Sequence, residues 1–505
     1  MKKLLAIVPI LGAAVSGCGE NPTPQKPNII FILADDMGYG DAGCYGQKLI
    51  ETPNIDALAA RGVKFNQCYS GAPVSAPARS VLMTGLHTGH TPVRANDEAG
   101  DRGDVWSHEA MLADSTLEGQ GPMPADTKTL GSMMQKAGYK TGVVGKWGLG
   151  YPGSASTPNK MGFDFFYGYN CQRQSHTYYP MFLYRNENRE YLDNAPLLTP
   201  NQKLDSLADK YDAKSYEKFT RKQYSGDLMF DELVGFVEAN KKEPFFLMWT
   251  TPIPHVSLQA PQRWIDHYQK KFNETEPYLS KNGYLPARYP HATYAAMVSY
   301  FDEQIGLLVE KLKADGLYDN TIIIFSSDNG ATFNGGTDSP WFNSGGIFRS
   351  DRGYGKGSLR EGGIRVPLIF TWPNQIKEPR ESNHICAFWD VMPTLGEITD
   401  IETPKTDGIS FLPEVMGKTQ AQHEALYWEY PEGTGSRAVR MGKWKGIIFD
   451  IKKGNNTMEL YNLENDILEE KNVAAENPEI VEQIRTIMKR EHVTPVNPKF
   501  IFFEE

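Results

Sequence analysis

Five short apolar segments, each followed by a polar turn, constrain the fold of this chain more than any other feature. Residues 28–34 (Asn28-Ile29-Ile30-Phe31-Ile32-Leu33-Ala34) are apolar without alternation, which is typical of a strand buried on both faces of a parallel sheet. Segments of the same kind follow at residues 140–144, 244–250, 321–326 and 366–371. Helix-length amphipathic segments separate them, and in the clearest, residues 294–313, one stripe carries Met297, Val298, Phe301, Ile305, Leu308, Val309 and Leu312. This alternation predicts an α/β fold with a mostly parallel central sheet.

Beyond about residue 405 the pattern changes. Short alternating segments at 437–448 and 459–463 and a helical pattern at 478–490 indicate a small α+β unit. A chain of 505 residues is long enough for a large domain and a smaller one. We therefore expect a main domain over residues 27–404 and a C-terminal subdomain over 405–505.

The N-terminus has the pattern of an export signal. Met1-Lys2-Lys3 precedes an apolar stretch, Leu4 to Val15, that is too short to span a membrane. Val15-Ser16-Gly17-Cys18 then resembles a bacterial lipobox, the alternative being an ordinary cleaved signal peptide. The pattern predicts a lipoprotein signal at 1–18, a lipidated Cys18, and a polar tether at 19–26. The mature protein would then be exported, facing the periplasm or lying at the cell surface, with the lipid as its membrane contact.

Charge and cysteine usage limit the classes of partner. Lys and Arg total 52 against 62 Asp and Glu, a formal net charge of -10, which argues against a nucleic-acid binder. The remaining cysteines have no paired spacing, so neither a disulfide framework nor a zinc site is expected: Cys44, Cys68, Cys171 and Cys386.

Acidic residues follow two of the predicted strands at the point where each ends. Asp35 and Asp36 come directly after the first strand, and Asp328-Asn329-Gly330 follows the strand at 321–326. The carboxyl ends of strands are where open α/β sheets build their sites, although solvated loops and Asn-Gly turns have similar sequences. Four such side chains would make an oxygen cage suited to Ca²⁺, with Mg²⁺ as the alternative.

Ser75-Ala76-Pro77-Ala78-Arg79, followed by Thr84-Gly85, resembles the maturation signature of type I sulfatases. In that family a Cys or Ser at the first position is oxidised to formylglycine (3-oxoalanine), and the Ser form resembles the substrates of anaerobic radical maturases. By itself the run also suits a Pro-containing turn that begins a helix. The hydrated aldehyde has two hydroxyls, one to attack sulfur and one to collapse and expel sulfate.

The resemblance covers roughly residues 27–470 and implies an alkaline-phosphatase-like sandwich that hydrolyses sulfate monoesters. It implies that Ca²⁺ is held by Asp35, Asp36, Asp328, Asn329 and the group derived from Ser75. It also implies that Arg79, Lys146 and Lys356 supply positive charge around the sulfate, with Arg79 holding the diol and the maturation geometry, and that His255 protonates the leaving alcohol. One position departs from the pattern: most sulfatases have His where this chain has Gly148, and His90 or His176 could substitute.

The leaving alcohol is expected to be a sugar, with the galactose or N-acetylgalactosamine type as the working hypothesis and sulfate removed in exo fashion. Arg173 and His176 in a polar insert, with Arg94 and Asn96, are suited to sugar hydroxyls, and Tyr178, Tyr179 or Trp341 to stacking on a sugar face. The insert could equally be a folded polar loop. Two other functions stay open at this point: a phosphate mono- or diester hydrolase of the same superfamily, and a non-catalytic glycan-binding lipoprotein.

Overall fold

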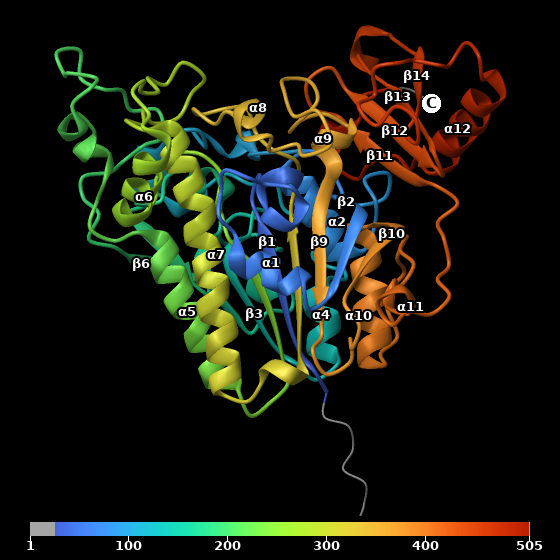
Figure 1. Cartoon of the computed structure of the whole chain (residues 1–505), viewed down its shortest axis with the longest axis horizontal. Coiled ribbons are helices and arrows are strands. Elements are labelled where there is room, and N and C mark those ends of the chain that lie inside the picture. Colours follow the sequence, from blue (N-terminus) through green and yellow to red (C-terminus); the bar gives the residue numbers. More distant parts are fainter. Residues whose placement is uncertain (1–25, 504–505) are drawn as a thin grey trace, which may run out of the picture.

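A computed structural model describes residues 26–503, so Cys18, the signal segment and residues 19–25 of the tether lie outside the described residues. Its centre is a 10-stranded sheet in the order β10-β2-β9-β8-β1-β7-β3-β4-β5-β6 (Figure 1). The strands are β1 (Asn28–Ala34), β2 (Val63–Tyr69), β3 (Lys140–Lys146), β4 (Phe165–Tyr169), β5 (Phe182–Arg185), β6 (Asn188–Tyr191), β7 (Phe245–Thr250), β8 (Thr321–Ser327), β9 (Arg365–Thr371) and β10 (Arg380–Ala387).

All five expected strands form, and four of them make the parallel centre of the sheet. β1 lies between β7 and β8 and is parallel to both, with Ile30 opposite Leu247 on one side and Ile323 on the other. β3 is parallel to β7. The fifth, β9, is antiparallel to its neighbours β8 and β2, so the sheet is mixed at that edge.

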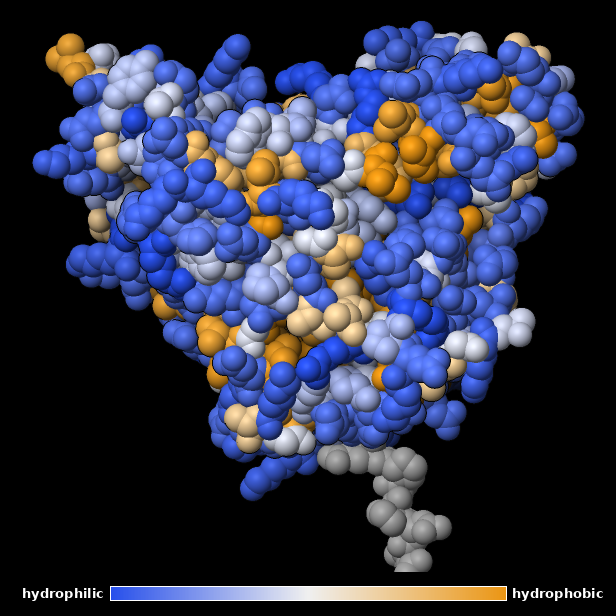
Figure 2. Space-filling model, viewed as in Figure 1, coloured by the Kyte–Doolittle hydropathy of each residue, from blue (hydrophilic) through white to orange (hydrophobic). Residues whose placement is uncertain are grey.

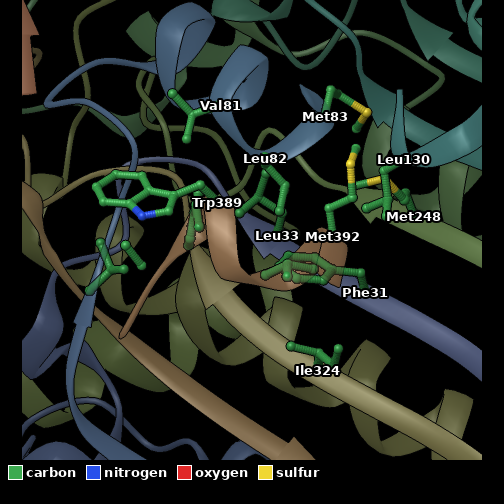
Figure 3. Close-up of a cluster of buried hydrophobic side chains, with 14 of the residues drawn as sticks. Phe31, Leu33, Val81, Leu82, Met83, Leu130, Met248, Ile324, Trp389 and Met392 are labelled. Carbon is green, nitrogen blue, oxygen red and sulfur yellow. The ribbon is translucent and has the colours of Figure 1, made fainter. Parts of the chain in front are cut away.

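Helices cover both faces of the sheet because β1 sends alternate apolar side chains to opposite sides. Ile29, Phe31 and Leu33 belong to the core beneath α2, α4 and α10, as Figure 3 shows for Phe31 and Leu33. Ile30 and Ile32 belong to the core on the other face, with α1, α5 and α7. The helices of the main domain are α1 (Pro53–Ala59), α2 (Ser75–Thr84), α3 (His108–Ala113), α4 (Leu130–Lys136), α5 (Ser225–Asn240), α6 (Gln262–Phe272), α7 (Pro290–Ala314), α8 (Ser339–Phe342), α9 (Glu361–Ile364) and α10 (Val391–Thr399).

A second, four-stranded antiparallel sheet lies within residues 405–505, with the order β11-β12-β13-β14. It sits at the upper right of Figure 1, beside α12. Its apolar face packs on Ile484, Ile487 and Met488 of α12, which makes the small α+β unit that the pattern predicted. The elements are α11 (Leu412–Val415), β11 (Leu426–Tyr430), β12 (Ser436–Met441), β13 (Trp444–Ile448), β14 (Met458–Asn462) and α12 (Pro478–Arg490).

The face in Figure 2 is mostly hydrophilic, with smaller groups of apolar residues between the charged ones. Among the helices of residues 26–503, none is both long and apolar enough to cross a bilayer. The four cysteines in this part of the chain, Cys44, Cys68, Cys171 and Cys386, are free thiols.

Candidate active site

Two acidic strand ends meet at the carboxyl edge of the sheet. Because β1 and β8 are parallel neighbours, Asp35 and Asp36 come to lie beside Asp328 and Asn329, nearly 300 residues further along the chain. The Asp36 backbone N–H donates to Asp328 Oδ1 (3.1 Å), and Asn329 Nδ2 donates to Asp36 Oδ1 (2.8 Å). All four side chains are fully buried. Asp36 has a φ of 63°, a left-handed conformation that a non-glycine residue adopts at a cost, so local contacts hold it there.

Ser75 reaches this cluster as the first residue of α2, a helix whose ten residues are all buried. Its Oγ donates to Asp35 Oδ1 (3.1 Å). Pro77 lies in the first turn, where its missing N–H costs nothing, and Gly85 ends the helix with a φ of 67°. A helix N-terminus also favours an anion beside it.

Three basic side chains surround the carboxylates. Lys146, the last residue of β3, donates to Ser75 Oγ (3.2 Å) and forms a buried ion pair with Asp35. Arg79, one turn into α2, pairs with Asp328 (3.1 Å) and donates to the Lys146 carbonyl (2.7 Å). Lys356 lies 2.7 Å from Asp36 and is the most exposed of the three.

His255 follows β7 and directs its ring toward the same cluster. Its Nδ1 contacts the Val256 carbonyl, which requires a proton on Nδ1, and its Nε2 lies 3.6 Å from Asp36 Oδ2. The His176 ring stacks on it, with centroids 4.8 Å apart and planes within 8°. The Tyr178 hydroxyl contacts the carbonyls of Pro252 and His255 at 2.7 Å each and so fixes this loop.

Burial and charge set the protonation states. Burial raises the pKa of Asp35, but the charges of Lys146, His255 and Arg79 outweigh it, and the net shift is downward. Burial lowers the pKa of Lys146. Burial, helped by the charge of Lys356, also lowers the pKa of His255.

The donor set fits a hard cation. Three carboxylates, of Asp35, Asp36 and Asp328, converge with the Asn329 amide, and Asn329 Oδ1 is buried without a hydrogen-bond partner in the described part of the chain. Asp35, Asp36 and His255 place one ligand-capable atom each within 4.8 Å of one another. An oxygen-rich set of this kind favours Ca²⁺ or Mg²⁺ over softer metals.

A cavity of about 870 Å³ opens above Ser75. Lys146, His255 and Lys356 line it, and so do three of the residues expected to contact substrate, Asn96, Arg173 and His176. The guanidinium of Arg173, however, donates to the carbonyls of Val105 and Trp106 and is therefore occupied by its own loop. Gln172, from the expected polar insert, lines the cavity too. Lining residues that the sequence did not single out include Trp106, Tyr284 and Glu432. Their spacing carries no motif, so only the fold reveals them.

Two expected substrate residues lie elsewhere. Arg94 is buried in an ion pair with Glu429 (3.0 Å), and His90 pairs with Asp407 (2.9 Å) and stacks on His87. Neither lines the cavity, so the structure corrects both assignments. Both partners belong to the C-terminal part of the chain, which the local sequence could not indicate.

The expected stacking residues are corrected as well. Tyr178 is fully buried and Tyr179 nearly so, and Trp341 stacks on His291 (4.3 Å) away from the cavity. The space beside Gly148 is filled by Gln172, whose Oε1 lies 3.4 Å from where a Cβ at position 148 would stand. His176 approaches His255 rather than this space.

Comparisons with known proteins agree with this geometry. The family model described as Sulfatase matches residues 27–401, and that described as N-sulphoglucosamine sulphohydrolase, C-terminal, matches residues 351–494. The chain is 28% identical to the N-acetylgalactosamine-6-sulfatase of Canis lupus familiaris, covering 86% of this chain and 74% of that protein. It is 26% identical to the N-acetylgalactosamine-6-O-sulfatase of Bacteroides thetaiotaomicron, covering 97% and 99%.

A solved structure described as Ps i-CgsB superposes with a TM-score of 0.71 at 28% identity, over 94% of each chain. The fold is thus the alkaline-phosphatase-like α/β sandwich of sulfatases. The family generally depends on formylglycine and a metal, and the motif around Ser75 and the buried carboxylates stand where such groups are needed. The chain therefore belongs to the sulfatase family and is a sulfuric ester hydrolase.

Proposed function

We propose that this protein removes O-sulfate from sulfated sugars in exo fashion, using formylglycine made from Ser75 and a bound Ca²⁺. The observation that carries the proposal is the position of Ser75 Oγ, at the floor of the cavity and within 3.2 Å of both Asp35 and Lys146. A nucleophile there faces any sulfate that enters.

Each side chain has a task that follows from its contacts. Asp35 and Lys146 orient the Ser75 side chain, and Arg79, Lys146 and Lys356 supply positive charge where the sulfuryl oxygens gain negative charge. With both ring nitrogens protonated, His255 is placed to give its Nε2 proton to the departing sugar oxygen, while Nδ1 keeps its proton on the Val256 carbonyl. The hydrated aldehyde would supply the attacking hydroxyl together with a second hydroxyl able to expel sulfate.

Asp35, Asp36, Asp328 and Asn329 would hold the cation, with the Ser75-derived group completing the set. A dication there would polarise a sulfate oxygen and lower the pKa of the attacking hydroxyl. We favour Ca²⁺ because three carboxylates and an amide from two separate strand ends give many oxygens in a flexible arrangement. Chelation followed by add-back of Ca²⁺ or Mg²⁺ alone distinguishes the two ions.

For the sugar, the names of two relatives support a galactose-type substrate, since both are N-acetylgalactosamine-6-sulfatases. The test is release of inorganic sulfate from 6-O-sulfated N-acetylgalactosamine, galactose and N-acetylglucosamine, with nitrophenyl sulfate and nitrophenyl phosphate alongside. Faster sulfate release from the N-acetylgalactosamine and galactose esters than from the N-acetylglucosamine ester supports the proposal. Equal rates on the glucosamine-type sugar would reject the sugar assignment, and faster phosphate release would favour the phosphate-ester hydrolase.

Maturation and location are part of the proposal. A maturase would convert Ser75, and mass spectrometry of the Ser75 peptide from the native host should show a loss of two hydrogens. Unconverted Ser75 would instead leave a folded, inactive glycan binder.

The lipobox-like sequence at Cys18 supports an exported, lipid-anchored protein. Cell fractionation of the parent and a Cys18→Ala variant tests it: only the parent should be found with membranes, and equal membrane association would reject the anchor.

A further inference from the structure

Trp106 is a large aromatic side chain left exposed in the wall of the catalytic cavity. It is 64% exposed, whereas Ser75 on the cavity floor is 4% exposed. It lies in the loop before α3 and belongs to none of the apolar core clusters of the described residues. An exposed aromatic inside a polar cavity marks a place where a ligand with an apolar face is bound.

The Trp106 ring is held in place rather than loosely attached. The Arg173 guanidinium lies 4.4 Å from the ring centroid and donates to the Trp106 carbonyl (2.6 Å). The residue after Trp106, Ser107, caps helix α3: the Ala110 backbone N–H donates to Ser107 Oγ (3.0 Å). Arg173 itself is buried, so it supports one part of the indole while the ring stays open to the cavity. A preorganised ring loses little entropy on binding.

One short segment fixes the ring relative to the reacting groups. The 3₁₀ turn Gln172–His176 carries Arg173, which holds Trp106, and His176, which stacks on His255. Gln172 from the same turn donates to Asn96 Oδ1 (2.9 Å), which also lies 3.3 Å from the backbone N of Ala76, next to Ser75. The distance between the aromatic ring and the site of sulfate transfer is therefore set by a rigid turn.

Three residues that line the cavity have polar atoms without a hydrogen-bond partner in the described part of the chain. Gln172 Oε1, Glu98 Oε2 and His108 Nε2 are buried and make no hydrogen bond within residues 26–503, and all three residues line the cavity. A buried polar atom without a partner is unfavourable, so the side chains around this part of the cavity favour a ligand that offers polar groups.

Resting on the proposed sugar sulfatase function, we propose that Trp106 stacks under a second pyranose ring, next to the one that bears the sulfate. The preferred substrate is then a sulfated oligosaccharide, at least a disaccharide, rather than a free sulfated monosaccharide. The cavity volume of about 870 Å³ falls in the upper part of the ~300–1,000 Å³ that small-molecule sites span, which leaves room for a second ring.

The experiment compares a 6-sulfated disaccharide with the monosaccharide that forms its sulfated end. In the parent, kcat/KM should be higher for the disaccharide. Trp106→Ala should reduce this preference by about 3–10-fold, mainly through KM, the scale of one aromatic contact. Trp106→Phe should retain most of the preference for the disaccharide. Trp341→Ala, an exposed tryptophan outside the cavity, is the matched control and should keep the preference.

Binding gives a second readout that does not require turnover. In a Ser75→Ala background, calorimetry should show weaker disaccharide binding when Trp106→Ala is added, with the monosaccharide affected less. An unchanged preference in folded Trp106→Ala, or equal losses for both substrates, would overturn the second-ring contact. If the parent releases sulfate from nitrophenyl sulfate and from neither sugar, the proposed function itself fails, and with it this inference.

Discussion

Ser75 Oγ donates a hydrogen bond to Asp35 Oδ1 at 3.1 Å, joining the first turn of a buried helix to the carboxyl end of a central strand. The bond ties the residue that we propose is oxidised directly to a proposed cation ligand. Both side chains are buried, so neither can move without disturbing the other.

Replacing Ser75 by Ala should abolish sulfate release while leaving the fold intact. The side chain makes contacts only at the cavity floor, so its loss removes the nucleophile without opening the core. We expect turnover to fall by about 10⁴-fold or more, as when a nucleophile is removed elsewhere. Sulfate release and thermal unfolding of the same preparation provide the measurement. Substantial residual activity in the variant would exclude Ser75 as the source of the nucleophile.

Replacing His255 by Ala should lower turnover of sugar sulfates by ~10²–10⁴-fold, the scale of a lost general acid. Nitrophenyl sulfate should be affected least, because nitrophenolate leaves without a proton. The comparison of the two leaving groups in parent and variant is the measurement. Equal losses for both esters would mean that His255 positions the substrate and does not protonate it.

Removing the cation should reduce both activity and stability. The buried carboxylates of Asp35, Asp36 and Asp328 repel one another, and a bound dication offsets this repulsion. An ion that binds the folded state and not the unfolded state stabilises the fold by about 2.7 kcal/mol when the free ion concentration is a hundred times Kd. Dialysis against a chelator should lower Tm and activity, and Ca²⁺ should restore both. In an Asp36→Asn variant, chelation and Ca²⁺ addition should change Tm and activity less than in the parent. Identical changes in the variant and the parent would place the ion elsewhere.

A buried ion pair joins the two parts of the chain, and breaking it should be costly. Lys445 of β13 is fully buried and lies 2.7 Å from Glu361 of α9 and 3.3 Å from Glu469. Lys445→Met would leave carboxylates without this charge, which costs about 3–5 kcal/mol of unfolding free energy. The nearby Lys443 is 43% exposed, so Lys443→Met should change stability by about 0.5 kcal/mol or less. The measurement is the unfolding free energy of both variants in urea. Similar losses of unfolding free energy in Lys445→Met and Lys443→Met would show that burial of the Lys445 ion pair has no special effect.

Glu361 should make stability depend on acid pH. Burial raises its pKa, but Lys445, Arg365 and Arg440 outweigh this effect and lower the pKa well below its usual 4.5. A group with a depressed folded-state pKa stabilises the fold fully above the unfolded value and loses that contribution as the pH falls. Unfolding free energy should therefore fall below about pH 4.5, and more steeply in the parent than in Glu361→Gln. Parallel pH profiles would contradict this.

Much of the fold and the reaction centre could be predicted from local sequence. Uninterrupted apolar runs such as residues 28–34 can only be buried on both faces, so they had to form the centre of a sheet. Asp35 and Asp328 follow two such runs, and parallel pairing brings strand ends to one edge. The direction of β9 was not predictable, because an apolar run carries no information on strand direction.

The sequence by itself thus determined the central strands of the main sheet, the acidic residues at their ends and the family, since each depends on short-range patterns. Only the tertiary structure decided that Arg94 pairs with Glu429, that Gln172 fills the space at Gly148, and that Trp106 faces the cavity. These contacts join loops far apart in the chain. Loops have no periodicity that records their partners, and a charged side chain has the same local pattern whether it binds a sugar or a distant carboxylate.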